Sequence, residues 1–400
     1  MKKVVLLLLL LSSIHANEWY EFKPSEKLGI SEFNMTDWLE KLAGIHGFVQ
    51  NVGNDLMFED GTKVKFYRRF EKAIRETGFK GTIIGSCFQA GSGPTHFYNL
   101  HTDVIMGLID RHNYHGGGTG HTFHPGKCKN RSMVSEPGSG LLVSGFQQVK
   151  NAPFSFSEWM SLIQNEWIAE GSPIVAAYGM GVQGWDASYS FASDFPHFTE
   201  TIHTPGIYNV MSPTQLALYP AMASMIYRND VKEGEIVSIR IIHIPSLIDG
   251  KMGFWEDLLQ DRDQKSFHGI TPNKALACGR IAVDFVDEFT KTEKPDFVKY
   301  WERESKFITS NTRQLYWNYS KDGYFTINTP GTKGCIGFSE GKTFNLDEVE
   351  ISIETPFAVV LVSSMDKKPI KKSKNLLVTT VARAKNTGME YNEDKTQISF

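Results

Sequence analysis

The sequence predicts an α/β domain followed by an all-β domain, and two patterns predict this order. Between about residues 68 and 191, short apolar runs alternate with segments of helical period, which is typical of a parallel sheet with crossover helices. From Gln314 onward, short strand-like runs are separated by turn signals at even spacing, which is typical of a β-sandwich. With 41% hydrophobic and 12% aromatic residues, the chain has enough apolar surface for two packed domains.

The N-terminus has the pattern of a secretory signal peptide over residues 1–16. Two lysines precede an apolar run from Val4 to Leu11, and the small residue Ala16 precedes a polar start. The run is too short to cross a bilayer, and no later segment has the roughly 20 apolar residues that a membrane helix needs. We therefore expect a secreted or periplasmic protein without a membrane span.

Charge and cysteine content exclude some classes of protein. The formal net charge is −3, which gives no reason to expect nucleic acid or an anionic membrane as a partner. The four cysteines lie far apart in a long chain, so they do not form the dense disulfide framework of small secreted domains. At most one or two bridges are expected among Cys87, Cys128, Cys278 and Cys335.

The segment 17–67 is predicted to form a β-hairpin that leads into the α/β domain. Its strand-like runs cover 47–50, 55–58 and 63–67. Between the second and third runs, Glu59, Asp60 and Gly61 provide the residues of a turn.

The domain predicted over 68–292 alternates helices and strands. Its helical segments cover 68–77, a stretch from 101 and 169–182, and its strands cover 82–87, 107–110, 154–157 and 187–191. A charged, Pro-containing connection at 292–306 separates it from the β-sandwich predicted over 307–400. Because the tail still has a strand pattern at Phe400, we expect the sandwich to lack its last strands.

One carboxylate lies at the end of a predicted strand. Pro153 marks the start of this strand, and Phe154 and Phe156 alternate with serines before Glu158 and Trp159. Placing a charged side chain at the edge of a buried strand costs free energy. Such a residue is therefore expected to have a role, either in catalysis or as a helix N-cap. We favour catalysis, because polar residues also follow the neighbouring strands.

Polar and aromatic residues follow several of the predicted strands, at 86–89, 110–114, 158–159 and 189–191. Parallel strands bring their C-terminal ends to one face, which is the active-site face of a (β/α) barrel. Aromatic rings stack on sugar rings, polar groups bind hydroxyls, and carboxylates act as acid or nucleophile. We therefore expect this face to bind carbohydrate.

Short motifs, in their order along the chain, resemble the last part of a clan A glycoside hydrolase barrel. They are Leu108 to Tyr114 (LIDRHNY), Phe156 to Trp159 (FSEW), 169–171 (AEG), 176–179 (AAYG) and 183–186 (QGWD). The tail segments that are similar to the trailing β-sandwich of large secreted bacterial members are 326–330 (TINTP), 355–357 (TPF) and 386–392 (NTGMEYN). The likeness covers most of residues 31–400 and implies a retaining hydrolase built on a (β/α)8 TIM barrel.

The resemblance implies a role for each candidate site residue. Glu158, at the end of the seventh barrel strand, corresponds to the nucleophile. The residues expected to bind the substrate lie at the sixth strand end, beside Glu158 and before the eighth strand: His112, Tyr114, Trp159, Trp185 and Asp186.

The chain also departs from the family. A full barrel needs about 250 residues, whereas only about 125 positions separate Tyr67 from Phe191. The first four barrel strands are missing, together with the Asn-Glu pair that supplies the family's acid/base, so we expect a partial (β/α)8 TIM-barrel-like domain. The nearest such pair, Asn165 and Glu166, falls after the seventh strand. An open half-barrel exposes sheet edges, so we also expect self-association.

The sequence does not identify an acid/base carboxylate. Retaining hydrolysis needs two carboxyl groups roughly 5 to 5.5 Å apart. Other acidic residues near the predicted site are Asp103, Asp110, Glu136, Glu170 and Asp186. The sequence pattern assigns none of these five as the acid.

A rival chemistry is metal binding in the segment that ends at Cys128. Its potential ligands are His112, His115, His121, His124 and Cys128, and three glycines at 116–118 allow the loop to fold back. The alternative is a Gly-rich active-site loop whose histidines contact sugar hydroxyls. We favour this alternative, because the spacing matches no short ligand motif, and we expect no metal and no cofactor.

Two functions remain open from the sequence. The first is a secreted hydrolase of poly- or oligosaccharide that acts by a retaining mechanism with Glu158 as nucleophile. The second is a catalytically impaired or inactive carbohydrate-binding remnant that lacks the acid/base glutamate.

Overall fold

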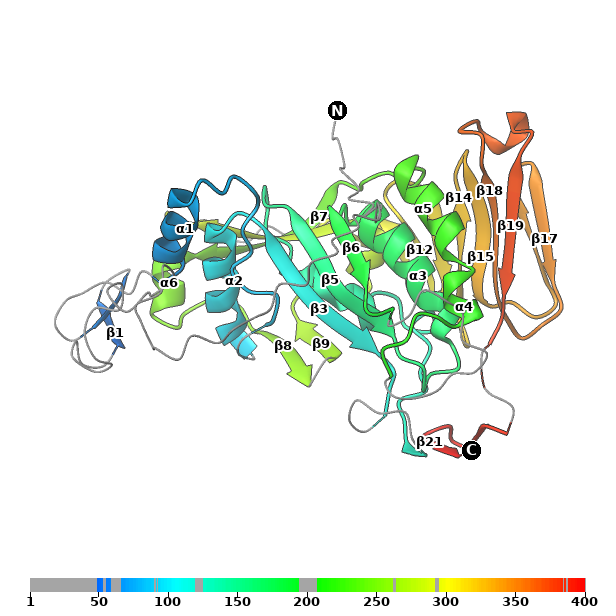
Figure 1. The fold of residues 1–400 in the computed structure, drawn as a ribbon, viewed down its shortest axis with the longest axis horizontal. Helices are drawn as coiled ribbons and strands as arrows, with labels where there is room; N and C mark the ends of the chain where they lie inside the picture. The colour runs from blue at the N-terminus through cyan, green and yellow to red at the C-terminus, as the bar shows by residue number, and fades with distance from the viewer. Residues whose placement is uncertain are drawn as a thin grey trace, which may run out of the picture.

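The computed structural model describes residues 49–52, 55–58, 66–89, 91, 93–118, 125–193, 207–261, 264–291, 295–383, 385 and 388–399. Within these residues the protein is a mixture of helices and strands with one large antiparallel sheet (Figure 1). The predicted signal peptide at 1–16 and the predicted turn at 59–61 lie outside the described residues. Strands β1 (Val49–Val52) and β2 (Asp55–Phe58) pair antiparallel with each other. The strand predicted over 63–67 is wrong at its end, because Phe66 and Tyr67 belong to helix α1 (Phe66–Glu76).

Two helices precede the first parallel strand. Helix α1 (Phe66–Glu76) covers the helix predicted over 68–77, and α2 (His96–Ile105) begins earlier than expected. The strand predicted over 82–87 is wrong, because these residues form an irregular connection. In this connection the Ser86 hydroxyl donates to the Phe88 carbonyl at 3.3 Å, a local side-chain bond that competes with a strand ladder, and to the Asp103 carboxylate of α2 at 3.0 Å.

Three parallel strands form the centre of the α/β part. In sheet order they are β3 (Ile109–His115), β5 (Phe154–Ser161) and β6 (Ala187–Ser190). A second parallel pair consists of β7 (Ile236–His243) and β10 (Arg280–Val286). A parallel bridge from Val149 to Val283 lies just before β5 in the chain. The strands described in the structure do not close into a barrel.

A helical layer lies between the parallel strands and the large sheet (Figure 1). Its segments are η3 (Ile168–Glu170), α3 (Gly171–Ile174), the π-helical η4 (Val175–Val182) and α5 (Tyr219–Tyr227). Tyr178 in η4 is buried, and its ring contacts Trp317 and Phe325 of the large sheet at centroid distances of 4.8 and 5.3 Å. Residues on the two sides of the expected boundary at 292–306 therefore share one apolar core.

Short elements complete the α/β part. They are η1 (Gly93–Thr95), β4 (Gly126–Lys127), η2 (Gly140–Gln147), α4 (Pro213–Leu216), α6 (Ile244–Ile248), β8 (Glu256–Asp261), β9 (Gln264–Gly269), α7 (Ala275–Cys278) and η5 (Val298–Tyr300). Strands β8 and β9 form an antiparallel hairpin. A fully buried ion pair between Arg240 and Glu256 ties this hairpin to β7, and burial of both partners makes loss of either one destabilising.

The large sheet is antiparallel throughout. In sheet order its strands are β11 (Trp301–Glu302), β12 (Phe307–Thr309), β13 (Leu315–Asn318), β14 (Tyr324–Asn328), β15 (Thr332–Phe338), β18 (Phe357–Ser364) and β19 (Leu376–Val381). The segment η6 (Ile370–Lys372) precedes β19. A separate hairpin, β16 (Lys342–Leu346) and β17 (Val349–Ile353), packs against β15 and β18 through a second apolar cluster that includes Phe344 and Cys335.

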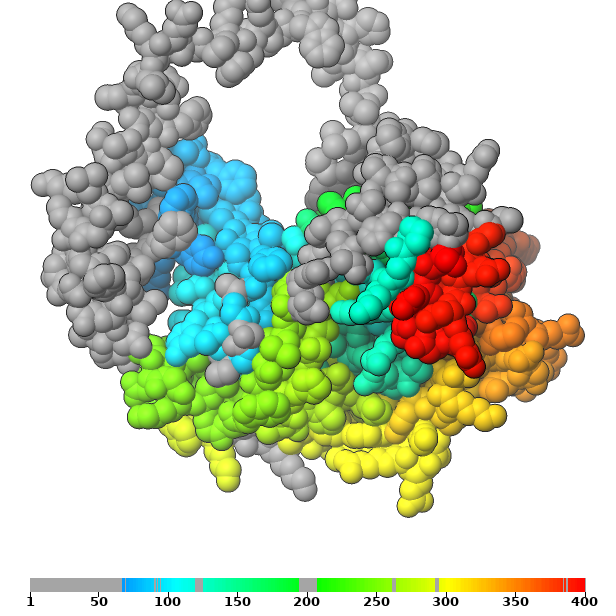
Figure 2. Space-filling view, turned by 90° about the horizontal axis from the view of Figure 1, so that it is seen from below, coloured from blue at the N-terminus to red at the C-terminus, as the bar shows by residue number. Residues whose placement is uncertain are grey.

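The C-terminal tail returns to the α/β part. Strands β20 (Glu390–Tyr391) and β21 (Gln397–Ser399) form a small sheet with β4, and Figure 2 shows the red tail against this teal segment. Glu166, which is 4% exposed, contacts Lys395 Nζ at 2.7 Å and Arg383 Nη1 at 3.4 Å. Glu166 thus belongs to the tail contact, whereas its neighbour Asn165 donates to the Arg131 carbonyl at 2.7 Å.

The cysteines and the helices bear on the predictions about disulfide bridges and membrane spans. All four cysteines are free thiols, so the structure has none of the one or two bridges that the sequence allowed. Across the described ranges, the helices are all too short or too polar to cross a membrane.

Candidate functional site

A β-bulge in β5 shapes the candidate site. Along the β3–β5 ladder, Arg111 lies opposite Phe156, while the next residue, His112, lies opposite Glu158. Ser157 is therefore an extra residue in β5, and such bulges redirect side chains near functional sites. Glu158 lies within the strand, since β5 continues to Ser161, and not at its end as the sequence analysis expected.

Alternate residues of β3 contact both residues at the bulge. Because side chains on a strand alternate between its faces, Asp110, His112 and Tyr114 point to one face. His112 Nε2 lies 2.9 Å from Ser157 Oγ, and Ser157 Oγ donates to Asp110 Oδ2 at 2.6 Å. The backbone N–H of Ser157 also donates to Asp110 Oδ1 at 3.2 Å. Asp110 and Ser157 together therefore orient the His112 ring.

Glu158 is held through one of its two oxygens. The Tyr114 hydroxyl donates to Glu158 Oε2 at 2.9 Å, and His112 Nδ1 lies 3.3 Å from the same oxygen. Among the described residues, no hydrogen bond to Glu158 Oε1 is found. The Glu158 side chain is 34% exposed. A fixed carboxylate with one free oxygen is the form that a nucleophile requires.

The tryptophans expected to bind substrate lie in the core. Trp159 is 5% exposed, and its Nε1 donates to Ser188 Oγ on β6 at 2.8 Å. Trp185 is 2% exposed, and its ring contacts Phe154 and Phe156 at centroid distances of 5.3 and 4.9 Å. The aromatic signal that marked both residues is equally typical of packing.

Asp186 lies at the opposite end of β5 from the bulge. Its Oδ2 accepts from the backbone N–H of Phe154 at 3.0 Å, and its own N–H donates to the Phe154 carbonyl at 2.8 Å. Phe154 precedes Glu158 by four residues, which is about 13 Å along a strand. The structure thus brings together Glu158, His112 and Tyr114, and it does not bring Asp186 to them.

Two of the five candidate acids are buried structural groups. Asp103 Oδ2 accepts from Arg111 Nη1 at 2.8 Å, both side chains are fully buried, and burial raises the pKa of Asp103. Glu170 accepts from Ser132 Oγ at 2.6 Å and from the N–H of Met133 at 2.5 Å. Burial outweighs these donors and raises the pKa of Glu170 to about 8. Neither carboxyl group contacts Glu158.

The other three candidate acids, Glu136, Asp186 and Asp110, lie in three different places. Glu136 is exposed in its loop, and Asp186 binds the start of β5. Asp110 is 2% exposed and joins the Glu158 network through Ser157 and His112. Of the five, Asp110 is therefore the one that lies in the same network as Glu158.

Cys87, Asp110 and His112 form the group of side chains that could hold a metal ion among the described residues. Their ligand atoms all lie within 4.8 Å of one another. Burial and the nearby carboxylate of Asp110 raise the pKa of the Cys87 thiol, which opposes the thiolate that a metal binds. Asp110 and His112 already share Ser157, so an ion would have to displace these hydrogen bonds.

The histidine-rich loop does not assemble its described members into one metal site. His115 Nε2 contacts the Arg131 carbonyl at 2.7 Å, and burial lowers the pKa of His115 to about 4. The Cys128 thiol contacts the Lys395 carbonyl at 3.8 Å. His121 and His124 lie outside the described residues. His115 and Cys128 thus bind backbone groups.

Sequence reasoning missed Ser157 as a member of the site, and it included Cys87 only within the strand-end stretch 86–89. Ser157 was assigned to the strand alternation before Glu158, and only the register with β3 reveals the bulge. Cys87 is the last residue of the strand predicted over 82–87, and its approach to β3 depends on the irregular connection that replaces this strand. Neither contact leaves a local signal in the sequence.

Comparison with protein-family models, with curated proteins and with solved structures gave no match to this chain.

Proposed function

We propose that the protein is a retaining glycoside hydrolase in which Glu158 is the nucleophile. The observation that carries this proposal is the convergence of Tyr114 and His112 on Oε2 of Glu158, whose side chain is 34% exposed. Two contacts to one oxygen hold the carboxylate in a fixed direction, which a nucleophile needs.

The proposed first step is attack by Glu158 Oε1 on the anomeric carbon of the sugar. The bond to the leaving-group oxygen breaks as the ester bond forms, and that oxygen takes a proton from a general acid. Water then cleaves the glycosyl ester and regenerates the carboxylate. Tyr114 and His112 hold Oε2 throughout, so the attacking oxygen keeps its direction.

The three parallel strands and the large sheet can be matched to the parts of a clan A glycoside hydrolase. In this proposal, β3, β5 and β6 are the sixth, seventh and eighth strands of a partial (β/α)8 barrel. The large antiparallel sheet and the β16–β17 hairpin are the layers of the trailing sandwich. Parallel pairing in the order β3, β5, β6 supports this interpretation.

A second candidate function is that of a catalytically impaired or inactive carbohydrate-binding remnant that lacks the acid/base glutamate. Among the described residues, none of the candidate acids is an exposed carboxylate next to Glu158 that could act as the general acid. Asp110 is 2% exposed and binds Ser157, so it is poorly placed to protonate a leaving group. This observation supports the second candidate, a carbohydrate-binding remnant whose catalysis is impaired or lost.

An activated glycoside separates the two candidates. A 2-fluoro glycoside with a good leaving group needs no general acid, so Glu158 alone can form the covalent adduct. An enzyme would be labelled and would also hydrolyse an unactivated oligosaccharide, whereas an impaired enzyme would be labelled without hydrolysis. A binding remnant would bind the saccharide and show neither reaction. Glu158→Gln should abolish labelling, and Glu136→Gln is the matched control at an exposed carboxylate.

We further propose that the protein is exported and that it self-associates. The signal pattern at 1–16 supports export. Edge strand β19 supports self-association, because Leu376 and Val378 are 46% and 61% exposed on it. An edge strand with exposed apolar residues invites pairing with a second chain.

A further inference from the structure

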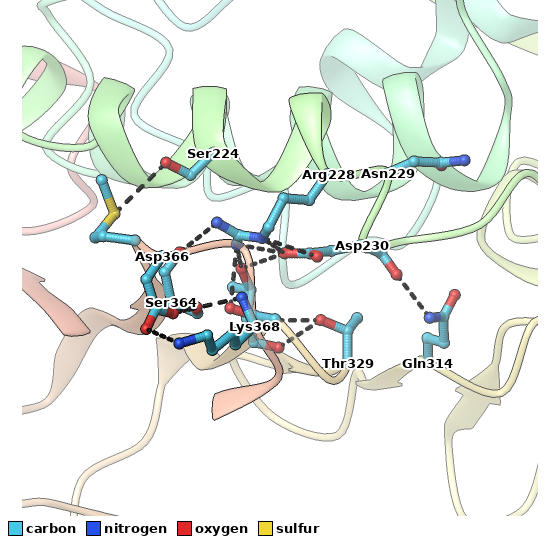
Figure 3. Close-up of polar contacts among 12 residues, drawn as sticks. Ser224, Arg228, Asn229, Asp230, Gln314, Thr329, Ser364, Asp366 and Lys368 are labelled. Atoms are coloured by element: carbon cyan, nitrogen blue, oxygen red, sulfur yellow. Dashed lines mark hydrogen bonds and ion pairs between the residues drawn. The ribbon is translucent and has the colours of Figure 1, made fainter. Parts of the chain in front are cut away.

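A groove of about 920 Å³ lies between the helical layer and the large sheet. One wall is the C-terminal end of α5, including Tyr227 and Arg228. The other wall consists of the β14–β15 turn at Pro330 and Gly331 and the segment 365–369 after β18 (Figure 3). The lining residues include none from β3, β5 or β6. The groove is therefore separate from Glu158, and its volume suits a ligand of several rings.

Arg228 fixes the two walls relative to each other. Its Nη2 donates to Asp230 Oδ2 at 2.5 Å and to the Gly331 carbonyl at 3.1 Å, and its Nη1 donates to the Ser364 carbonyl (Figure 3). Thr332 Oγ1 also donates to Asp230 Oδ2, at 2.8 Å. Arg228 and Asp230 side chains are only 14% and 7% exposed. This ion pair joins the helix to two turns of the sheet, so the groove is preorganised.

Asp366 fixes the segment that carries two lysines of the groove. It accepts from the Lys374 N–H at 3.1 Å, from Ser373 Oγ at 2.8 Å and from Ser364 Oγ at 3.0 Å. The hydrogen bond from the Lys374 backbone and these hydroxyls lower the pKa of Asp366. Asp366 therefore stays ionised and holds the turn in one conformation.

The groove is positively charged although the chain as a whole is not. Its lining contains four cationic side chains, Arg228, Lys232, Lys367 and Lys368, and one carboxylate, Asp230. Lys368 Nζ lies 3.7 Å from Asp366, and even with Asp366 counted the excess is two positive charges. The whole chain has a net charge of −3. This local reversal of sign favours an anionic ligand.

Apolar surface lies beside these charges. Tyr227 is 60% exposed and Met365 is 40% exposed, and Pro330 and Pro369 also line the groove. An exposed tyrosine ring offers a flat apolar face with a polar edge, which suits the face of a pyranose ring. A simple inorganic anion would use the lysines and leave this surface uncovered.

We propose that this groove binds an acidic oligosaccharide. A sugar ring packs on Tyr227, and carboxylate or sulfate groups face Lys232, Lys367 and Lys368. The anionic class of the ligand follows from the groove alone, whereas its saccharide nature rests on the proposed function. The groove thus provides a second contact for a polymer that the Glu158 site acts on or holds.

Calorimetric titration of the full chain with a short oligogalacturonate and with a sulfated oligosaccharide tests the groove. We expect binding of at least one of them and no binding of a neutral cello-oligosaccharide. The double variant Lys367→Glu/Lys368→Glu and the variant Tyr227→Ala should each weaken binding about tenfold or more. The matched control is Lys371→Glu/Lys372→Glu on the neighbouring η6, outside the groove lining, which should leave the affinity unchanged.

Three results would overturn the proposal. The first is that neither acidic oligosaccharide binds the unmodified protein. The second is an equal loss in the control variant, which would indicate a general charge effect. The third is an unchanged affinity in Tyr227→Ala with displacement by inorganic phosphate, which would indicate a small-anion site. Labelling of Glu158 by an activated glycoside should be unaffected in all these variants, so failure of the groove proposal is distinguishable from failure of the hydrolase proposal.

Discussion

The Tyr114 hydroxyl donates a 2.9 Å hydrogen bond to Glu158 Oε2, across the ladder between β3 and β5. Tyr114 is 3% exposed, and its ring packs edge-on against Tyr208 at a centroid distance of 4.9 Å. A buried tyrosine that is fixed by packing sets the position of a partly exposed carboxylate. Tyr114 therefore fixes the orientation of the Glu158 carboxylate.

Tyr114→Phe should slow labelling of Glu158 by an activated glycoside. The substitution keeps the packed ring and removes one hydrogen bond to a charged group, so we expect a decrease of about tenfold to a hundredfold in labelling rate. The control is Tyr391→Phe, which removes a hydroxyl that donates to the Gln164 carbonyl at 3.0 Å, outside the Glu158 network. Equal labelling rates in the two variants would show that Tyr114 does not direct Glu158.

Glu170 should make stability depend on pH. Its folded-state pKa of about 8 lies above the ordinary value of 4.5. The neutral buried acid therefore contributes stability in full below about pH 4.5, and this contribution is lost as the pH rises through about 8. Glu170→Gln keeps a neutral side chain, so its free energy of unfolding should vary less with pH, by on the order of a few kcal/mol.

Urea unfolding of both proteins at pH values from about 5 to 9 measures this difference. Glu136→Gln, at an exposed position, is the control and should follow the unmodified protein. If Glu170→Gln and the unmodified protein lose stability in parallel over this range, the carboxyl group of Glu170 is already ionised at neutral pH.

Glu166→Gln should loosen the C-terminal tail. The substitution removes the carboxylate that contacts Lys395 and Arg383, whose side chains are 44% and 49% exposed. Because solvent screens these partners, we expect a loss of only about 1 to 2 kcal/mol. Hydrogen exchange should rise in the sheet of β4, β20 and β21, whereas Glu393→Gln, at an exposed position in the tail, should leave the exchange unchanged.

Val378→Lys should reduce self-association of the protein. Val378 is 61% exposed on β19, the edge of the large sheet, and a lysine there opposes strand pairing. Sedimentation velocity should show dimers or larger species for the unmodified protein and a monomer for this variant. Val298→Lys, at a position that is 53% exposed but outside the strands, is the control. A monomeric unmodified protein would contradict the prediction.

Local patterns in the sequence were enough to predict several elements. The helical spacing after Arg68 corresponds to α1, and the alternation before Glu158 corresponds to the first half of β5. The turn signals after Gln314 correspond to the strands of the large antiparallel sheet. Each of these elements is defined by residues close together in the chain, so its period is visible in one sequence.

Features that depend on distant residues were not predictable. The bulge at Ser157 exists only relative to β3, and the burial of Trp185 depends on Phe154 and Phe156 across the layer. Asp186 has a side chain suited to a site, but its bonds to Phe154 place it at the start of β5. Residue type therefore indicated which residues to consider for a site, and tertiary register decided which of them lie together.

The most direct test of the account is peptide mapping by mass spectrometry after reaction with an activated 2-fluoro glycoside. We predict one covalent glycosyl adduct, located on Glu158 and absent in Glu158→Gln. An adduct on a different residue, or no adduct in a preparation that still binds saccharide, would contradict the assignment of Glu158 as the nucleophile.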